Sequence, residues 1–105
     1  MYFKTNMKEL SGWGRFPKIK TTELMPNSES QLIEILKNNK SYIPRGNGRS
    51  YGDSAVNKSL TINMTGMNRF LEWNEHTGEL IAESGVLIAD ILDAFLPDGW
   101  FPYVT

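Results

Sequence analysis

The sequence runs PRGNGRSYGDSA from Pro44 to Ala55, a loop rich in glycine and arginine that joins two apolar segments. Glycine reaches positive φ without steric cost and lets the backbone approach a ligand closely. Inward-turned backbone N–H groups and arginine side chains are donors suited to phosphate oxygens. From spacing alone, a plain glycine-rich turn between two strands explains the loop equally well. The candidate binding residues are Arg45, Gly46, Asn47, Gly48, Arg49, Ser50, Tyr51, Gly52 and Asp53.

The glycine spacing separates this loop from two common nucleotide-binding motifs. Its pattern is G-x-G-x-x-x-G, and no apolar stripe of helical period follows Gly52. The dinucleotide fingerprint needs G-x-G-x-x-G at the start of a helix, and the P-loop needs a lysine followed by serine or threonine. The loop is therefore neither of these motifs.

The segments before the loop are predicted to be strand, helix and strand. Ile19–Met25 alternates roughly between apolar and polar residues, which predicts a strand. Ser28 and Gln31 match the capping-box pattern, and an apolar stripe follows, which predicts a helix over residues 29–37. A short buried strand is predicted over Tyr42–Pro44, directly before the loop.

The segments after the loop are predicted to be strand, hairpin and helix. Residues 60–64 alternate as a half-buried strand does. Phe70–Trp73 and Glu79–Ser84 flank a polar turn, which predicts an antiparallel hairpin. Leu87–Leu96 has apolar residues at helical spacing and precedes a proline. The predicted fold is α+β, a small mixed sheet covered by two helices, in one incomplete domain over residues 1–105.

The composition excludes several classes of protein. The 105 residues include 11 basic and 12 acidic side chains, so the formal net charge of −1 does not favour nucleic acid as a partner. Cysteine is absent, which fits a reducing compartment and predicts a cytoplasmic location. No apolar run is long enough to be an integral membrane segment.

Three motifs resemble those of the FAD-linked oxidoreductases of the vanillyl-alcohol oxidase and p-cresol methylhydroxylase type, whose FAD-binding domain is called PCMH-type. The first is the loop itself, Pro44–Asn57, and the second is Gly12-Trp13-Gly14-Arg15. The third runs from Glu83 to Pro102, so the resemblance covers essentially the whole chain. Within that superfamily, the motifs are most similar to those of decaprenylphosphoryl-ribose oxidases and their bacterial relatives.

The resemblance implies that residues 46–51 bind the pyrophosphate of FAD, with Arg45 and Arg49 nearby. It places Trp13 and Arg15 towards the flavin or the substrate. Relatives such as alditol oxidases attach FAD covalently through a histidine where this sequence has Arg49, so the FAD is expected to be non-covalent. The implied substrate of the parent oxidoreductase is a small sugar-like or alditol-like alcohol.

The chain is expected to be the N-terminal part of a longer flavoenzyme, because the family's substrate domain and catalytic residues would follow Thr105. No catalytic residue is assigned, and the fragment by itself is expected to be inactive. The alternative is a stand-alone module that binds a phosphate-bearing ligand or a protein. Residues 100–104 are predicted to form an exposed apolar patch that favours self-association.

The remaining polar residues have simpler explanations. His76 is predicted to be an exposed residue of the hairpin turn. No metal site is predicted, because aspartates of the second helix and Asp98 fit a solvated surface. The glutamates of the hairpin are interpreted as outward strand positions; they are Glu72, Glu75, Glu79 and Glu83.

Overall fold

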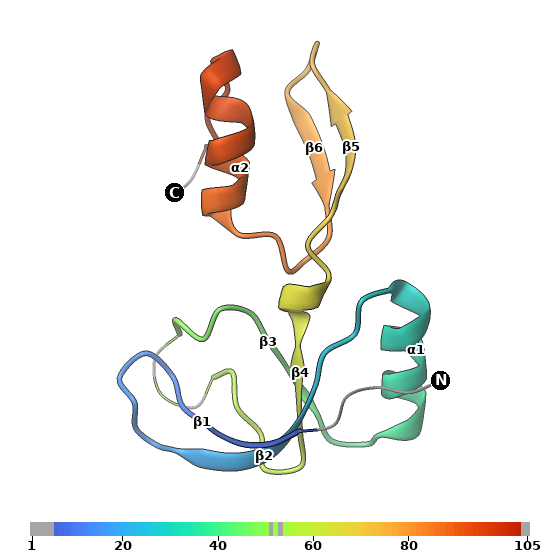
Figure 1. Cartoon of the computed structure of the whole chain (residues 1–105), viewed down its shortest axis with the longest axis vertical. Coiled ribbons are helices and arrows are strands. Elements are labelled where there is room, and N and C mark those ends of the chain that lie inside the picture. Colours follow the sequence, from blue (N-terminus) through green and yellow to red (C-terminus); the bar gives the residue numbers. More distant parts are fainter. Residues whose placement is uncertain (1–5, 51, 53, 104–105) are drawn as a thin grey trace. The chain divides into compact units, whose positions relative to one another are not determined.

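The computed structural model describes residues 6–50, 52 and 54–103. The chain divides into two compact units, residues 1–66 (unit 1) and residues 67–105 (unit 2). The predicted α+β class is confirmed: described residues form a four-stranded mixed sheet, a two-stranded sheet and two α-helices. Figure 1 shows that each helix belongs with its own sheet, one in each unit, a division that the sequence did not predict.

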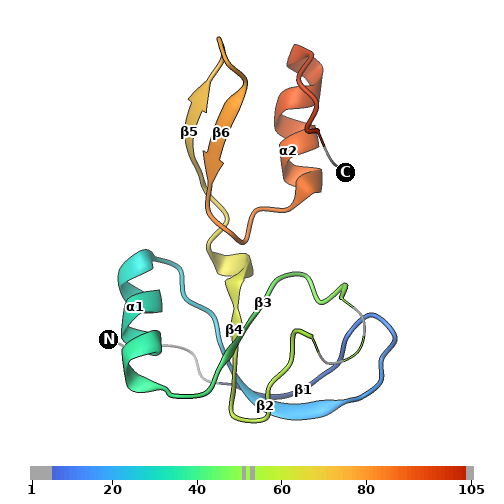
Figure 2. The same ribbon diagram turned by 180° about the vertical axis from the view of Figure 1, so that it is seen from behind.

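The sheet of unit 1 has the strand order β1-β2-β4-β3, and Figure 2 shows it from behind. The strands are β1 (Asn6–Leu10), β2 (Ile19–Leu24), β3 (Ile43–Arg45) and β4 (Leu60–Asn63). β1 is antiparallel to β2, whereas β2 and β3 both run parallel to β4. β1 was not predicted, because NMKEL lacks an apolar alternation and its Met7 is 71% exposed. Pairing with β2 is what makes this segment a strand.

Helix α1 (Glu29–Asn38) begins at the predicted cap. The Ser28 hydroxyl accepts a hydrogen bond from the Gln31 N–H at 3.3 Å. The Gln31 side chain accepts from the Asn27 N–H, one residue before the N–H that a capping box uses. At the other end, the Asn39 amide donates to the Ile35 carbonyl, one of the carbonyls that a helix end leaves without a partner.

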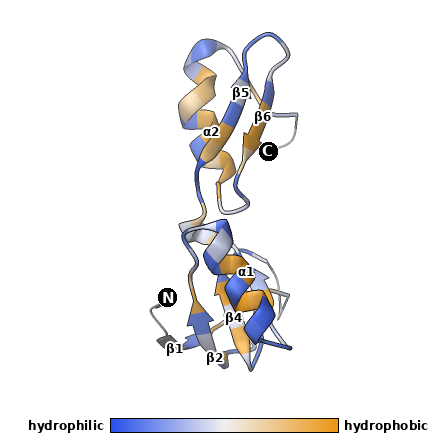
Figure 3. Cartoon of the chain, turned by 90° about the vertical axis from the view of Figure 1, so that its right-hand side faces the viewer, coloured by the Kyte–Doolittle hydropathy of each residue, from blue (hydrophilic) through white to orange (hydrophobic). Residues whose placement is uncertain are grey.

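One face of the unit 1 sheet packs against α1 to form the main core. Ile35 of α1 lies against Leu60 and Ile62 of β4, and all three side chains are buried. Leu24, Leu32 and Met64 are partly buried around them. Figure 3 shows the corresponding apolar colouring in both α1 and β4. Met64 itself starts a short 3-10 helix, Met64–Gly66, so β4 ends one residue earlier than predicted.

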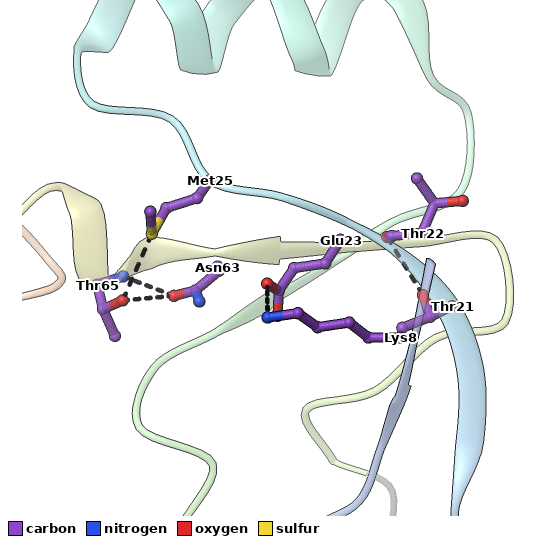
Figure 4. A network of polar contacts seen from close by, with 7 residues as sticks. All are labelled: Lys8, Thr21, Thr22, Glu23, Met25, Asn63 and Thr65. Carbon is purple, nitrogen blue, oxygen red and sulfur yellow. Dashed lines mark hydrogen bonds and ion pairs between the residues drawn. The ribbon is translucent and has the colours of Figure 1, made fainter. Parts of the chain in front are cut away.

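The other face of the sheet carries buried polar side chains. Thr21 and Thr61 are both 0% exposed, and their hydroxyls are 3.0 Å apart. Glu23 is also buried and pairs with Lys8 at 2.9 Å, as Figure 4 shows. The prediction of a half-buried β4 is therefore wrong, since this central strand is covered on both faces.

Unit 2 consists of a hairpin and a helix. The hairpin strands are β5 (Phe70–Asn74) and β6 (Glu79–Ala82), and the helix is α2 (Ile88–Phe95), followed by the 3-10 helix Leu96–Asp98. The rings of Trp73 and Phe95 lie 4.3 Å apart, so the hairpin packs on α2. In the part of the chain that is described, neither helix is long and apolar enough to cross a membrane.

Candidate functional site

The glycine loop begins where β3 ends, and two of its glycines have the positive φ that the sequence indicated. Gly48 has φ 69° and Gly52 has φ 61°. At Gly48 the space is also restricted, because a Cβ atom there would lie 2.9 Å from the guanidinium carbon of Arg45. The Arg45 side chain lies beneath Gly48 and donates to the Ala55 carbonyl at 3.4 Å. Arg45 therefore spans the loop from its start to its end.

A second segment, Gly12–Arg15, docks on this loop. The Trp13 N–H donates to the Ser50 carbonyl at 2.7 Å, and Figure 1 shows the blue loop after β1 beside the green loop after β3. Gly12 is buried against the loop backbone, where a Cβ atom would lie 2.5 Å from the Ser50 oxygen. The turn closes with Arg15, whose φ is 63° and whose N–H donates to the Gly12 carbonyl at 3.1 Å.

The two segments enclose a cleft of about 500 Å³ within unit 1. Its lining includes three arginine side chains, and none of the described residues that line it is acidic. Among described residues the ion pairs are Lys8–Glu23 and Arg69–Glu83, so no described carboxylate neutralises these arginines. The lining residues are Ser11, Gly12, Trp13, Arg15, Arg45, Asn47, Gly48 and Arg49.

The division into units reveals a charge separation that the net charge of −1 conceals. Residues 1–66 carry 10 of the 11 basic side chains and 5 of the 12 acidic ones, which gives unit 1 a formal charge of +5. Residues 67–105 carry the rest, which gives unit 2 a formal charge of −6. The arginine cleft thus lies in the unit with the positive formal charge, which favours an anionic ligand.

The predicted binding residues occupy different places around the cleft. Arg45, Asn47, Gly48 and Arg49 line it. A Cβ atom added at Gly46 would have no atom within 4 Å other than those of Gly46 and its chain neighbours. Ser50 and Gly52 contact the Gly12 segment through their backbones. Tyr51 and Asp53 lie outside the described residues.

Sequence reasoning missed two lining residues, Ser11 and Gly12. Gly12 belongs to the quoted GWGR motif, so the motif gave a signal for the segment although not for its contact with the loop. Ser11 precedes that motif and carried no signal of its own.

In unit 2, one of the four hairpin glutamates differs from its prediction. The Glu83 side chain is only 7% exposed and accepts from the Arg69 guanidinium at 2.7 and 3.1 Å and from the Arg69 N–H at 2.9 Å. The prediction of an outward position is wrong for Glu83, because this bidentate pair folds its side chain back across the base of the hairpin. The hydrogen bonds from Arg69 hold the pKa of Glu83 below its ordinary value and raise the pKa of Arg69.

Other polar residues of unit 2 have local structural roles. Asn74 accepts hydrogen bonds from the N–H groups of His76 and Thr77, so His76 is an exposed turn residue as predicted. Asp90 accepts from the Leu87 N–H at 2.9 Å and caps α2. Among described residues, no group of three or more histidine or acidic side chains is placed to hold a metal ion.

A second cavity, of about 340 Å³, lies between the hairpin and α2 and has a mainly aromatic and aliphatic lining. Trp100 lies over Gly78 and meets Trp73 edge-on, with ring centroids 5.3 Å apart. The prediction that residues 100–104 form an exposed apolar patch is therefore wrong for Trp100, because the ring packs into unit 2. Val104 lies outside the described residues. Phe101 and Tyr103 remain exposed.

Comparison with known proteins agrees with the family resemblance. A family model described as FAD binding domain matches residues 23–105. The decaprenylphosphoryl-β-D-ribose oxidase of Mycolicibacterium smegmatis is 32% identical over 107 aligned residues, which cover 95% of this chain. The chain spans only 23% of the length of that oxidase.

Proposed function

We propose that this chain, which belongs to the FAD binding domain family, holds the pyrophosphate of FAD in the arginine cleft of unit 1. FAD, the cofactor of that family, supplies the redox chemistry when it is bound, and the protein supplies binding and orientation. The observation that carries the proposal is the convergence of Arg15, Arg45 and Arg49 on one cleft without a described acidic neighbour.

The chemistry of the cleft fits a diphosphate. Guanidinium groups donate two parallel hydrogen bonds to phosphate oxygens, and such charge-assisted bonds are stronger than neutral ones. Gly48 at φ 69° lets the loop backbone pass directly over the Arg45 side chain. This chain offers no histidine in the loop, so the proposed binding is non-covalent.

We further propose that the parent protein is an oxidoreductase that transfers a hydride from a sugar-like alcohol to FAD. The support is the similarity to an oxidase whose name specifies a ribose derivative. Because the chain spans less than a quarter of that relative, no residue here is assigned to the chemical step. A cytoplasmic location stays a prediction from the cysteine-free sequence.

The pyrophosphate proposal is tested by titrating the chain with FAD and riboflavin and following flavin fluorescence. FAD should bind more tightly than riboflavin, which has no phosphate, and inorganic pyrophosphate should compete. Arg49→Met should weaken FAD binding by roughly 10- to 100-fold, the equivalent of one charge-assisted hydrogen bond. Lys37→Met is the matched control, since it removes the same charge from an exposed position of α1 outside the cleft.

Two results would decide against the proposal. Equal binding of FAD and riboflavin would show that the phosphates are not recognised, and equal effects of the two variants would exclude a specific role for the cleft. Binding of pyrophosphate as tight as that of FAD would instead favour the alternative, a stand-alone module for phosphate-bearing ligands.

A further inference from the structure

Asn47 is the one asparagine of the sequence that is followed by glycine, and it lies in the lining of the arginine cleft. The residue is exposed, and residues 46–48 belong to neither a helix nor a strand. Among the described residues, none forms a hydrogen bond with the Asn47 side chain or with the Gly48 N–H. The carboxamide and the backbone nitrogen that follows it are therefore available to react with each other.

Asparagines elsewhere in the chain are held more firmly. The Asn74 side chain accepts hydrogen bonds from the N–H groups of His76 and Thr77. The Asn63 side chain accepts from the Thr65 N–H at 3.0 Å. A carboxamide fixed in this way has to lose its hydrogen bonds before it can react. In both cases the next residue also carries a side chain, which hinders attack by its backbone nitrogen.

The structure also places a positive charge beside the reacting nitrogen of Gly48. The guanidinium carbon of Arg45 lies 2.9 Å from the position that a Cβ atom of Gly48 would take. A backbone nitrogen attacks a carbonyl carbon as its anion, and a fixed cation nearby favours that anion. Because Gly48 has φ 69° and no side chain, nothing of its own shields the nitrogen from Arg45.

We infer that Asn47 is a self-modification site, at which the Gly48 backbone nitrogen displaces ammonia from the Asn47 carboxamide. The Gly48 nitrogen forms a bond to the side-chain carbonyl carbon, and the bond from that carbon to the amide nitrogen breaks. The proton of Gly48 leaves with the ammonia. Water then opens the resulting cyclic imide at either carbonyl, which gives aspartate or isoaspartate. The net change exchanges ammonia for water, so no oxidant or reductant is needed.

The modification would change the charge of the cleft. Its product is a carboxylate in a lining whose described residues include three arginines and no acidic side chain. This carboxylate lowers the local positive charge and repels a phosphate. Isoaspartate also lengthens the loop backbone by one carbon atom directly before Gly48. The loss of phosphate binding rests on the proposed function, whereas the modification itself does not.

The modification is tested by incubating the folded chain at neutral and at mildly alkaline pH, followed by mass spectrometry of a chymotryptic digest. Chymotrypsin cuts after Tyr42 and Tyr51, so Asn47 is followed in the peptide of residues 43–51. Exchange of ammonia for water should be at least roughly tenfold faster at Asn47 than at Asn74. It should accelerate as the pH rises. A synthetic peptide of residues 43–51 should react at a similar rate.

The effect on the cleft is tested with pyrophosphate before and after the incubation. The affinity of the unchanged chain should fall by roughly tenfold or more as Asn47 is converted. Asn47→Asp, which carries the product carboxylate, should bind weakly from the start. Asn47→Gln is the control, because its longer side chain closes the ring far more slowly. Its pyrophosphate affinity should keep its own starting value throughout the incubation.

The outcomes separate this inference from the proposed function. Slow conversion of Asn47 in the folded chain, while the synthetic peptide reacts, would overturn the inference, since the native loop would then protect the asparagine. Conversion that leaves pyrophosphate affinity unchanged would disprove the effect on the cleft. A fresh chain that does not bind pyrophosphate would contradict the proposed function but not the modification, because the conversion is measured without a ligand.

Discussion

Gly48 and Gly46 lie two residues apart in the same loop, yet the structure constrains them very differently. Gly48 has a positive φ and lies over the Arg45 guanidinium. Gly46 has open space around its Cβ position. The sequence predicted that the loop needs glycine, but it could not say which glycine the geometry requires.

This contrast predicts different effects for two alanine substitutions. Gly48→Ala places a side chain at φ 69°, which costs about 1–2 kcal/mol of folding free energy, and it displaces Arg45 from beneath the loop. Gly46→Ala should change stability by less than about 0.5 kcal/mol. Chemical denaturation measures both values, and pyrophosphate titration should show weaker binding for Gly48→Ala alone. Similar results for the two variants would show that Gly48 does not need its positive φ over the Arg45 side chain.

At the scale of elements, strands and helices with a local signal were predictable. The capping residues of α1, the polar turn between β5 and β6 and the apolar face of α2 all depend on neighbours within a few positions. β1 was missed because its strand conformation depends on pairing with β2. The Arg69–Glu83 pair was missed for a similar reason, since it forms only when the hairpin brings residues 14 positions apart together.

That pair makes the stability of unit 2 depend on pH. The pKa of Glu83 is lower in the folded state than its ordinary value of 4.5, because Arg69 donates to the ionised carboxylate. The stabilisation is therefore complete above this ordinary value and is lost as the pH falls through the lowered folded-state value. The midpoint temperature of thermal unfolding of unit 2 should decrease over this acid range. Tryptophan fluorescence measures it in a Trp13→Phe background, in which the remaining tryptophans, Trp73 and Trp100, both belong to unit 2.

Variants separate this pair from the other acidic groups. Arg69→Gln should lower the midpoint near neutral pH and should flatten its decrease in acid. Glu79→Gln, which removes an exposed carboxylate of β6, should leave the acid decrease in place. An unchanged pH profile in Arg69→Gln would show that other groups cause the acid dependence.

At the scale of the whole molecule, the two units carry opposite formal charges of +5 and −6. The charge of unit 1 adds a long-range attraction to the short-range hydrogen bonds of the cleft. Raising the salt concentration from 0.1 M to 1 M shortens the screening length from about 10 Å to about 3 Å. Pyrophosphate affinity should therefore fall by roughly tenfold or more over this range, whereas riboflavin affinity should hardly change. Pyrophosphate binding that is insensitive to salt would argue against charge recognition.

The sequence by itself determined the FAD binding domain family, the α+β class, most of the strands and helices, and the loop with its arginines and glycines. These features depend on residue type and on contacts between residues that are close in the chain, so the order of residues along the chain is enough to predict them. Only the tertiary structure decided that Gly12–Arg15 docks on the loop and that Arg15, Arg45 and Arg49 share one cleft. These contacts join residues that are far apart in the sequence, such as Trp13 and Ser50, from loops that follow the two opposite edge strands of the sheet, β1 and β3. The separation of charge between the units likewise depends on where the chain divides, because net charge contains no spatial information.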